Sequence, residues 1–72
     1  MNLQDIKDVF KECKVTPEVE ITEDVTLKEL GVDSLDMAMI VYEINERVDK
    51  ELEFEADQTV GEVLEYINNV SE

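Results

Sequence analysis

The residues best suited to chemistry lie at the middle of the chain, in the stretch GVDSLD at residues 31–36, where one serine stands between two aspartates. Histidine is absent and Cys13 is the only cysteine. The chain therefore lacks a Ser-His or Cys-His nucleophile, an intramolecular disulfide and a zinc site built from cysteine and histidine. These absences exclude the commonest catalytic chemistries and leave open what Ser34 does.

The surrounding residues place Ser34 at the start of a helix. Gly31 suits the left-handed backbone that ends the preceding connection, and Asp33 is the expected N-cap. Asp36 follows three residues later, near the positive end of the helix dipole. Free backbone N–H groups at such a terminus favour an anion, so a phosphate ester on Ser34 would suit the position. Alternatively, Ser34 is only a well-tolerated first helical residue beside an Asp cap.

Apolar residues at helical spacing predict two further helices. The first begins after Asn2, an N-cap candidate, and the last begins after Thr59, which forms a capping-box pattern with Glu62. Their apolar positions are Leu3, Ile6, Val9, Phe10 and Cys13 in the first helix, and Val60, Val63, Leu64, Ile67 and Val70 in the last.

Two connections join the three helices. Residues 16–30 form a long one, in which Thr16 and Pro17 have the pattern of an N-cap followed by proline at the first helical position. The segment 52–58 is short and polar, and we expect a loop or a single turn there. The apolar residues expected to hold the long connection against the core are Ile21, Val25, Leu27 and Leu30. The prediction is an all-α bundle forming a single domain, residues 1–72.

The helix that starts at Ser34 and runs to about Val48 is apolar on two sides. One stripe should face the core, namely Met37, Val41, Ile44 and Val48, with Ile40 beside it. The other consists of Leu35, Met39 and Tyr42. A domain this small cannot bury both, so we expect the second stripe to be an exposed docking surface, unless a connection covers it.

The charge balance limits the partners. Twenty Asp and Glu against six Lys and Arg give a net charge of -14, which repels nucleic acid and anionic membranes and favours basic protein surfaces. Hydrophobic residues at helical spacing argue against disorder. We expect a cytoplasmic monomer.

Cys13 lies on the apolar stripe of the first helix and is assigned no chemistry. The acidic segments contain no calcium-loop pattern, so no metal site is predicted.

The stretch GVDSL, preceded by LKEL at residues 27–30, resembles the G-x-D-S-L motif of acyl carrier proteins. An amphipathic first helix, a long loop, the motif at the start of the second helix and a terminal helix follow the order of that family. The resemblance implies that Ser34 receives 4′-phosphopantetheine from coenzyme A through a phosphopantetheinyl transferase, with Gly31, Asp33, Leu35 and Asp36 as supporting motif residues. It implies an acyl-carrier-like helical bundle with three main helices plus short turns.

The resemblance further implies that the protein is a carrier rather than an enzyme. It would be a phosphoprotein that serves fatty-acid biosynthesis and lipid metabolism, or else polyketide or related biosynthesis. Acyl cargo would be held as a thioester and passed between acyl-transfer and condensing enzymes with basic docking patches. The acidic docking positions are Asp33, Asp36 and Glu46, beside Leu35, Met39 and Tyr42. An aminoacyl, D-alanyl or peptidyl carrier remains an alternative within this architecture. An acidic interaction module without a prosthetic group is the alternative outside it.

Three departures from the family pattern bear on these expectations. Met39 stands where many fatty-acid carriers have glutamate, which removes part of the acidic docking stripe. The segment between Val48 and Thr59 is shorter by about one turn, so the family's short third helix is expected to be reduced or absent, with an altered acyl pocket. Leu27 stands where phenylalanine is frequent, a mild core substitution.

Overall fold

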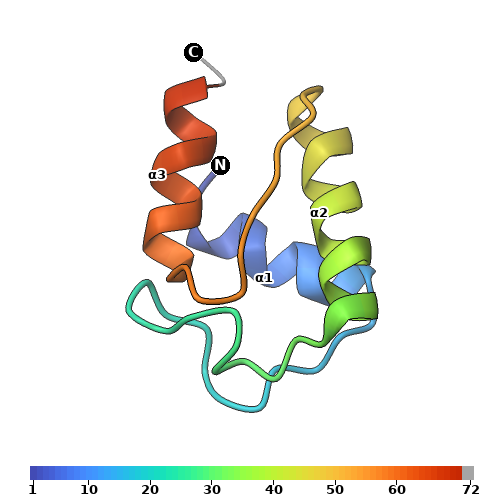
Figure 1. Cartoon of the computed structure of the whole chain (residues 1–72), viewed down its shortest axis with the longest axis vertical. Coiled ribbons are helices and arrows are strands. Elements are labelled where there is room, and N and C mark those ends of the chain that lie inside the picture. Colours follow the sequence, from blue (N-terminus) through green and yellow to red (C-terminus); the bar gives the residue numbers. More distant parts are fainter. Residues whose placement is uncertain (71–72) are drawn as a thin grey trace.

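The computed structural model describes residues 1–70, so the last two residues of the expected domain lie outside the described residues. Three helices form: α1 (Leu3–Glu12), α2 (Ser34–Val48) and α3 (Val60–Val70). In Figure 1, α2 and α3 stand side by side while α1 runs across their lower halves, and α1 contacts both. No strand forms within residues 1–70. The predicted all-α bundle of three main helices is confirmed.

The outer helices begin where their caps predict. At α1, the Asp5 N–H donates to Asn2 Oδ1 (3.0 Å), and the Asn2 N–H donates to Asp5 Oδ2 (2.9 Å). At α3, the Glu62 N–H donates to the Thr59 hydroxyl (3.1 Å), and the Thr59 N–H donates to Glu62 Oε1 (3.0 Å). Each reciprocal pair satisfies two backbone donors that the helix itself cannot.

The pattern of an N-cap at Thr16 followed by proline at the first helical position starts no helix, and the backbone bends instead at Glu18 and Val19. The Glu18 N–H, which a helix start would leave free, donates instead to Leu30 O across the connection (3.0 Å). A turn forms further on, where the Glu29 N–H donates to the Thr26 hydroxyl (3.0 Å). Tertiary pairing of the backbone therefore outweighed the local start signal.

The long connection and the segment before α3 are joined through their backbones. The Lys28 N–H donates to Ala56 O (2.8 Å), and the Val60 N–H donates to Val25 O (2.8 Å). The second of these bonds, together with the one from the Leu27 N–H to Gln58 O (3.1 Å), forms an isolated antiparallel bridge between Thr26 and Thr59. These bonds set where α3 begins relative to the chain that leads into α2.

One core serves the whole chain, and its members come from all three helices and both connections. Within α2 the fully buried residues are Ile40 and Ile44, each 1% exposed, whereas Met37, Val41 and Val48 are only partly buried. The expectation that Ile40 merely flanks the core stripe is therefore wrong. The shift has a packing cause, because Ile40 and Ile44 face the residues that α1 and α3 turn inward, namely Ile6, Phe10, Val60 and Val63. The buried residues are Ile6, Val9, Phe10, Ile21, Leu27, Leu30, Val32, Ile40, Ile44, Leu52, Phe54, Val60, Val63, Leu64 and Ile67.

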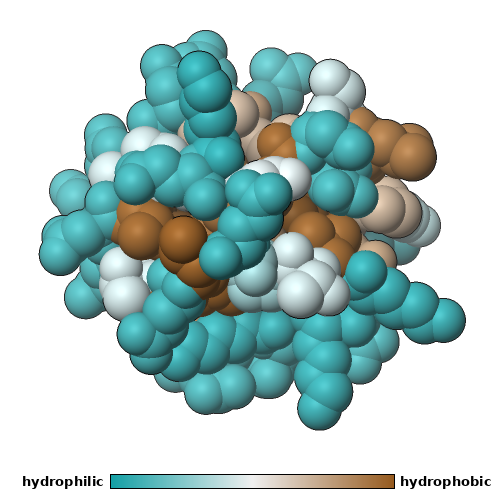
Figure 2. All heavy atoms as spheres, turned by 90° about the horizontal axis from the view of Figure 1, so that it is seen from below, coloured by the Kyte–Doolittle hydropathy of each residue, from teal (hydrophilic) through white to brown (hydrophobic). Residues whose placement is uncertain are grey.

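One face of the molecule is largely hydrophilic. Figure 2 shows the face seen from below, where hydrophilic atoms predominate and apolar atoms reach the surface in smaller patches between them. Among residues 1–70, no helix combines the length and the apolar character needed to cross a bilayer.

Candidate attachment site and groove

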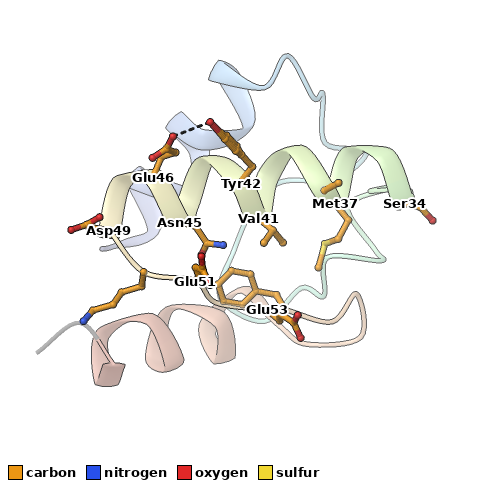
Figure 3. A pocket seen from close by; sticks show the side chains of 12 residues that line it. Ser34, Met37, Val41, Tyr42, Asn45, Glu46, Asp49, Glu51 and Glu53 are labelled. Carbon is orange, nitrogen blue, oxygen red and sulfur yellow. Dashed lines mark hydrogen bonds between the residues drawn. The ribbon is translucent and has the colours of Figure 1, made fainter.

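Ser34 is the first residue of α2 and its side chain is exposed, as the sequence predicts. Asp33 caps the helix, with an extended backbone and a carboxylate that accepts the Asp36 N–H at 2.8 Å. The free N–H groups of the first turn and the helix dipole give this end a partial positive charge. In Figure 3, Ser34 lies at the end of α2 and its hydroxyl points away from the helix. An acceptor oxygen is thus presented to solvent at a helix terminus.

Gly31 makes this presentation possible. Its φ of +82° is left-handed, and a Cβ there would lie 2.6 Å from side-chain atoms of Glu18. The Gly31 N–H donates to Lys28 O (3.0 Å), which closes the turn before the cap. A side chain at this position would be strained by the backbone and would displace Glu18. The glycine expected from the motif is therefore required by the geometry.

A groove of about 1010 Å³ runs along α2 from Ser34 to the segment that follows the helix. Its apolar lining is Met37, Ala38, Val41 and Phe54. Figure 3 shows Met37 and Val41 directed into it and the carboxylates spread around it. The polar lining consists of Tyr42, Asn45, Glu46, Asp49, Lys50, Glu51 and Glu53. The groove is open, and its apolar part is surrounded by four carboxylates and one ammonium.

The far wall of the groove is a loop anchored to both neighbouring helices. Asn45 of α2 hydrogen-bonds to both backbone groups of Leu52 (3.0 and 3.1 Å). Phe54 packs edge-on against Tyr66 of α3, with ring centroids 5.8 Å apart. No helix forms between α2 and α3, where the sequence predicts a loop or one turn. The loop is the wall of the groove opposite α2.

The core beneath the groove has little free space. A hollow of about 10 Å³ is enclosed by core residues that include Met37 and Phe54, which also line the groove. This is near the smallest cavity volume, roughly 10–15 Å³, that can hold one water molecule. A long chain attached at Ser34 would therefore find room along the open groove, and it would enter the core only if these side chains moved.

The exposed stripe of α2 is where the sequence places it. Leu35, Met39 and Tyr42 are 71%, 38% and 58% exposed, so the prediction that no connection covers them is confirmed. The Tyr42 hydroxyl donates to Glu46 Oε1 at 2.9 Å, and this hydrogen bond, more than the nearby charge, raises the pKa of Tyr42. Asp33 and Glu46 are also exposed, whereas Asp36 is partly buried. The six proposed docking residues thus lie along one helix.

Cys13 is the C-cap of α1 and is partly buried. Its Sγ lies 3.5 Å from Met39 O, in the geometry of a weak hydrogen bond. Burial, followed by the charge of Glu43, raises the pKa of the Cys13 thiol. Within residues 1–70, no three His, Cys, Asp or Glu side chains are grouped to hold a metal ion.

Sequence reasoning missed much of the groove. Asn45 carried a detectable signal, because it is an uncharged polar residue one turn after Val41 on a partly apolar face. The loop residues carried none, since only the path of the chain after α2 brings them opposite the helix. The missed lining residues are Met37, Ala38, Val41, Asn45, Asp49, Lys50, Glu51, Glu53 and Phe54.

Comparisons with known proteins agree with this geometry. The family model described as "phosphopantetheine attachment site" matches residues 4–67. Acyl carrier proteins of Lactococcus lactis subsp. cremoris strains MG1363 and SK11 and of Lactococcus lactis subsp. lactis strain IL1403 are each 31% identical over 65 residues. The alignments cover 89% of this chain and 89% of each relative. No solved structure matches the chain.

The family match spans nearly all of α1, all of α2 and most of α3, and it includes the exposed serine at the start of α2. It identifies the prosthetic group as covalent 4′-phosphopantetheine and the protein as a carrier rather than a catalyst, which excludes the alternative of an interaction module without a prosthetic group. A free hydroxyl at a helix N-terminus, beside a groove with room for a long arm, fits such a group. The chain belongs to the acyl carrier protein family.

Proposed function

We propose that Ser34 carries the 4′-phosphopantetheine arm, and that this protein, a single cytoplasmic domain of residues 1–72, delivers acyl intermediates between enzymes of fatty-acid, polyketide or related biosynthesis. The observation that carries the proposal is the exposed Ser34 hydroxyl at the N-terminus of α2, at one end of the groove. The bound arm supplies a thiol that holds the acyl group as a thioester. The relatives are named acyl carrier proteins, which supports acyl cargo.

The residues around Ser34 present the hydroxyl without activating it. Gly31 sets the turn, and the carboxylate of Asp33 is occupied by the Asp36 N–H. No histidine is present to act as a base. The phosphopantetheinyl transferase must therefore remove the proton from Ser34 when the phosphodiester forms. The helix dipole then favours the phosphodiester anion, although the nearby carboxylates of Asp33 and Asp36 repel it.

Recognition by partner enzymes is proposed to use the exposed side of α2. Leu35, Met39 and Tyr42 supply a small apolar contact, and Asp33, Asp36 and Glu46 meet basic patches on the transferase and on the acyl-transfer and condensing enzymes. Charge steering speeds encounter, while a small apolar contact keeps each complex short-lived. Short-lived complexes suit a carrier that must leave one enzyme before it reaches the next.

The attachment site is tested by intact-mass analysis after incubation with coenzyme A and a phosphopantetheinyl transferase. The wild-type chain should gain one phosphopantetheine, and Ser34→Ala should gain none. Ser71 is the other serine and lies outside the described residues, so Ser71→Ala is the matched control and should be modified as efficiently as the wild type. Modification of the Ser34→Ala chain at Ser71 or Cys13 would overturn the assignment.

A second candidate cargo has one observation in its favour. Glu46, Asp49, Glu51 and Glu53 line the groove against a single Lys50, a balance that complements a protonated amine. This favours an aminoacyl, D-alanyl or peptidyl carrier. Arms loaded with β-alanyl and butyryl groups differ by one ammonium in place of a methyl group. Amine cargo is supported if the β-alanyl form of the wild type melts at a higher temperature than its butyryl form and if Glu51→Gln removes this difference. Equal melting temperatures of the two wild-type forms would leave neutral acyl cargo.

A further inference from the structure

A second hollow, of about 520 Å³, lies beside the C-terminal half of α1 and shares no residue with the groove at Ser34. We call it the lysine hollow. It contains three of the chain's six basic residues and none of its twenty acidic residues, although acids dominate the sequence. Its lining is Lys7, Phe10, Lys11, Lys14, Val15, Thr16, Pro17 and Ile21. It is therefore an apolar depression with a positively charged rim.

The three lysines have no acidic partner in the described part of the chain. The one ion pair within residues 1–70 joins Arg47 to Glu43. Lys7 and Lys11 are four residues apart on α1, where two like charges repel each other. The helix dipole favours Lys11 in the last turn, but it does not account for Lys7 at mid-helix or for Lys14 beyond the helix end. Folding alone therefore does not explain the cluster.

Lys14 also occupies an unfavourable backbone conformation. The Val15 N–H donates to Phe10 O (2.9 Å) and the Lys14 N–H to Lys11 O (3.1 Å), which is the C-terminal motif in which glycine is usual. The φ of Lys14 is +58°, in the left-handed region that glycine adopts without strain. A lysine there adds a cation to the hollow where glycine would fold more easily. Strain retained at one residue is often associated with function.

We propose that the lysine hollow binds a small amphiphilic anion. Its apolar body would lie on Phe10, Pro17 and Ile21, and its carboxylate or phosphate group would lie among the three lysines. Pockets of 300–1,000 Å³ with mostly apolar linings and a few charged groups are typical of small-ligand sites. This inference goes beyond the carrier function and does not depend on the attachment at Ser34.

Charge favours a small ligand over an acidic protein or a membrane. A specific protein interface needs about 1,000 Å² or more, so a macromolecule would also contact the acidic surface beyond the hollow. The net charge of -14 repels such a partner. A small anion can instead sit within a Debye length, about 8 Å, of the lysines, where their local field is only partly screened.

The test is to titrate the full ¹⁵N-labelled chain with octanoate and, separately, with octyl phosphate, and to monitor the backbone amides by NMR. The two ligands compare a carboxylate with a phosphate group. Octanol and inorganic phosphate are the controls that lack the charge or the apolar chain. We expect saturable shifts at residues 7–21 with either anionic amphiphile, and affinity at least about 10-fold weaker for both controls. Octanol binding as tightly as octanoate, or shifts centred on the groove at residues 37–54, would overturn the proposal.

Three variants separate binding from folding. Lys14→Gly relieves the left-handed strain, so it should raise the melting temperature and weaken octanoate binding about 2- to 5-fold. Lys7→Gln should weaken binding by a similar factor. Lys28→Gln is the matched control, because Lys28 is exposed and lines neither hollow, and it should change the affinity little. Equal weakening in all three variants would mean nonspecific attraction and contradict the proposed site.

Discussion

Asn45 pairs with both backbone polar groups of Leu52. Its amide nitrogen donates to Leu52 O at 3.1 Å, and its Oδ1 accepts the Leu52 N–H at 3.0 Å. Leu52 is buried, so these groups would otherwise lose water without gaining a partner. In a regular helix these two groups would pair with other backbone groups. Here the side chain of Asn45 pairs with them, and it thereby fixes the loop that forms the wall of the groove opposite α2.

Asn45→Ala should therefore destabilise the fold by about 1–3 kcal/mol, because two partly buried backbone groups lose their partner. Urea denaturation measures the free energy of unfolding, and hydrogen exchange at the Leu52 amide should accelerate. Asn69→Ala is the matched control, since Asn69 is exposed on α3, and it should change stability by less than about 0.5 kcal/mol. An Asn45→Ala protein as stable as the control would show that the pair contributes little.

The exposed and buried sides of α2 should respond differently to mutation. Met39→Glu or Tyr42→Ala should slow transfer to or from a cognate enzyme and leave the melting temperature nearly unchanged, because both side chains are exposed. Ile44→Ala should cost about 2–5 kcal/mol of stability, because Ile44 is fully buried. Transfer kinetics and thermal melts make the comparison. If Met39→Glu unfolds the domain, the outer stripe is part of the core.

Added salt should stabilise this protein. Its net charge of -14 is carried by a small domain, so self-repulsion opposes the compact state, and ions screen that repulsion. The melting temperature should rise between low salt and about 0.5 M sodium chloride, and more steeply with a divalent cation at millimolar concentration. A melting temperature independent of ionic strength would contradict the repulsion argument.

The Cys13 thiol should ionise at higher pH in the folded protein than in the unfolded one. Burial, and then the charge of Glu43, raise its pKa above the ordinary value. A raised pKa means that the folded state binds the proton more tightly. The contribution of the thiol to stability is thus complete below its unfolded pKa and is lost as the pH rises through the folded pKa.

The rate of alkylation by iodoacetamide against pH, in buffer and in concentrated urea, measures both ionisations. The midpoint in buffer should lie at higher pH than the midpoint in urea. A native midpoint at or below the unfolded one would show that an attractive charge outweighs burial at Cys13.

The helices of this protein could be predicted from local sequence. The cap side chains of Asn2, Asp33 and Thr59 each accept a hydrogen bond from the backbone N–H three residues later, and apolar residues at helical spacing follow each cap. Such signals depend on neighbours within one or two turns, which the sequence displays directly. The exposed position of Ser34 follows from the same local rules, because a residue just after an Asp cap lies at the helix terminus.

Contacts between distant segments could not be predicted in this way. The core position of Ile40 depends on how α2 is rotated against α1, and the bend at Glu18 depends on its backbone hydrogen bond to Leu30. The groove exists because Asn45 holds Leu52. Local sequence thus determined the helices and the serine that begins α2, whereas the groove and the lysine hollow arise only where packing and long-range backbone pairing bring separate segments together.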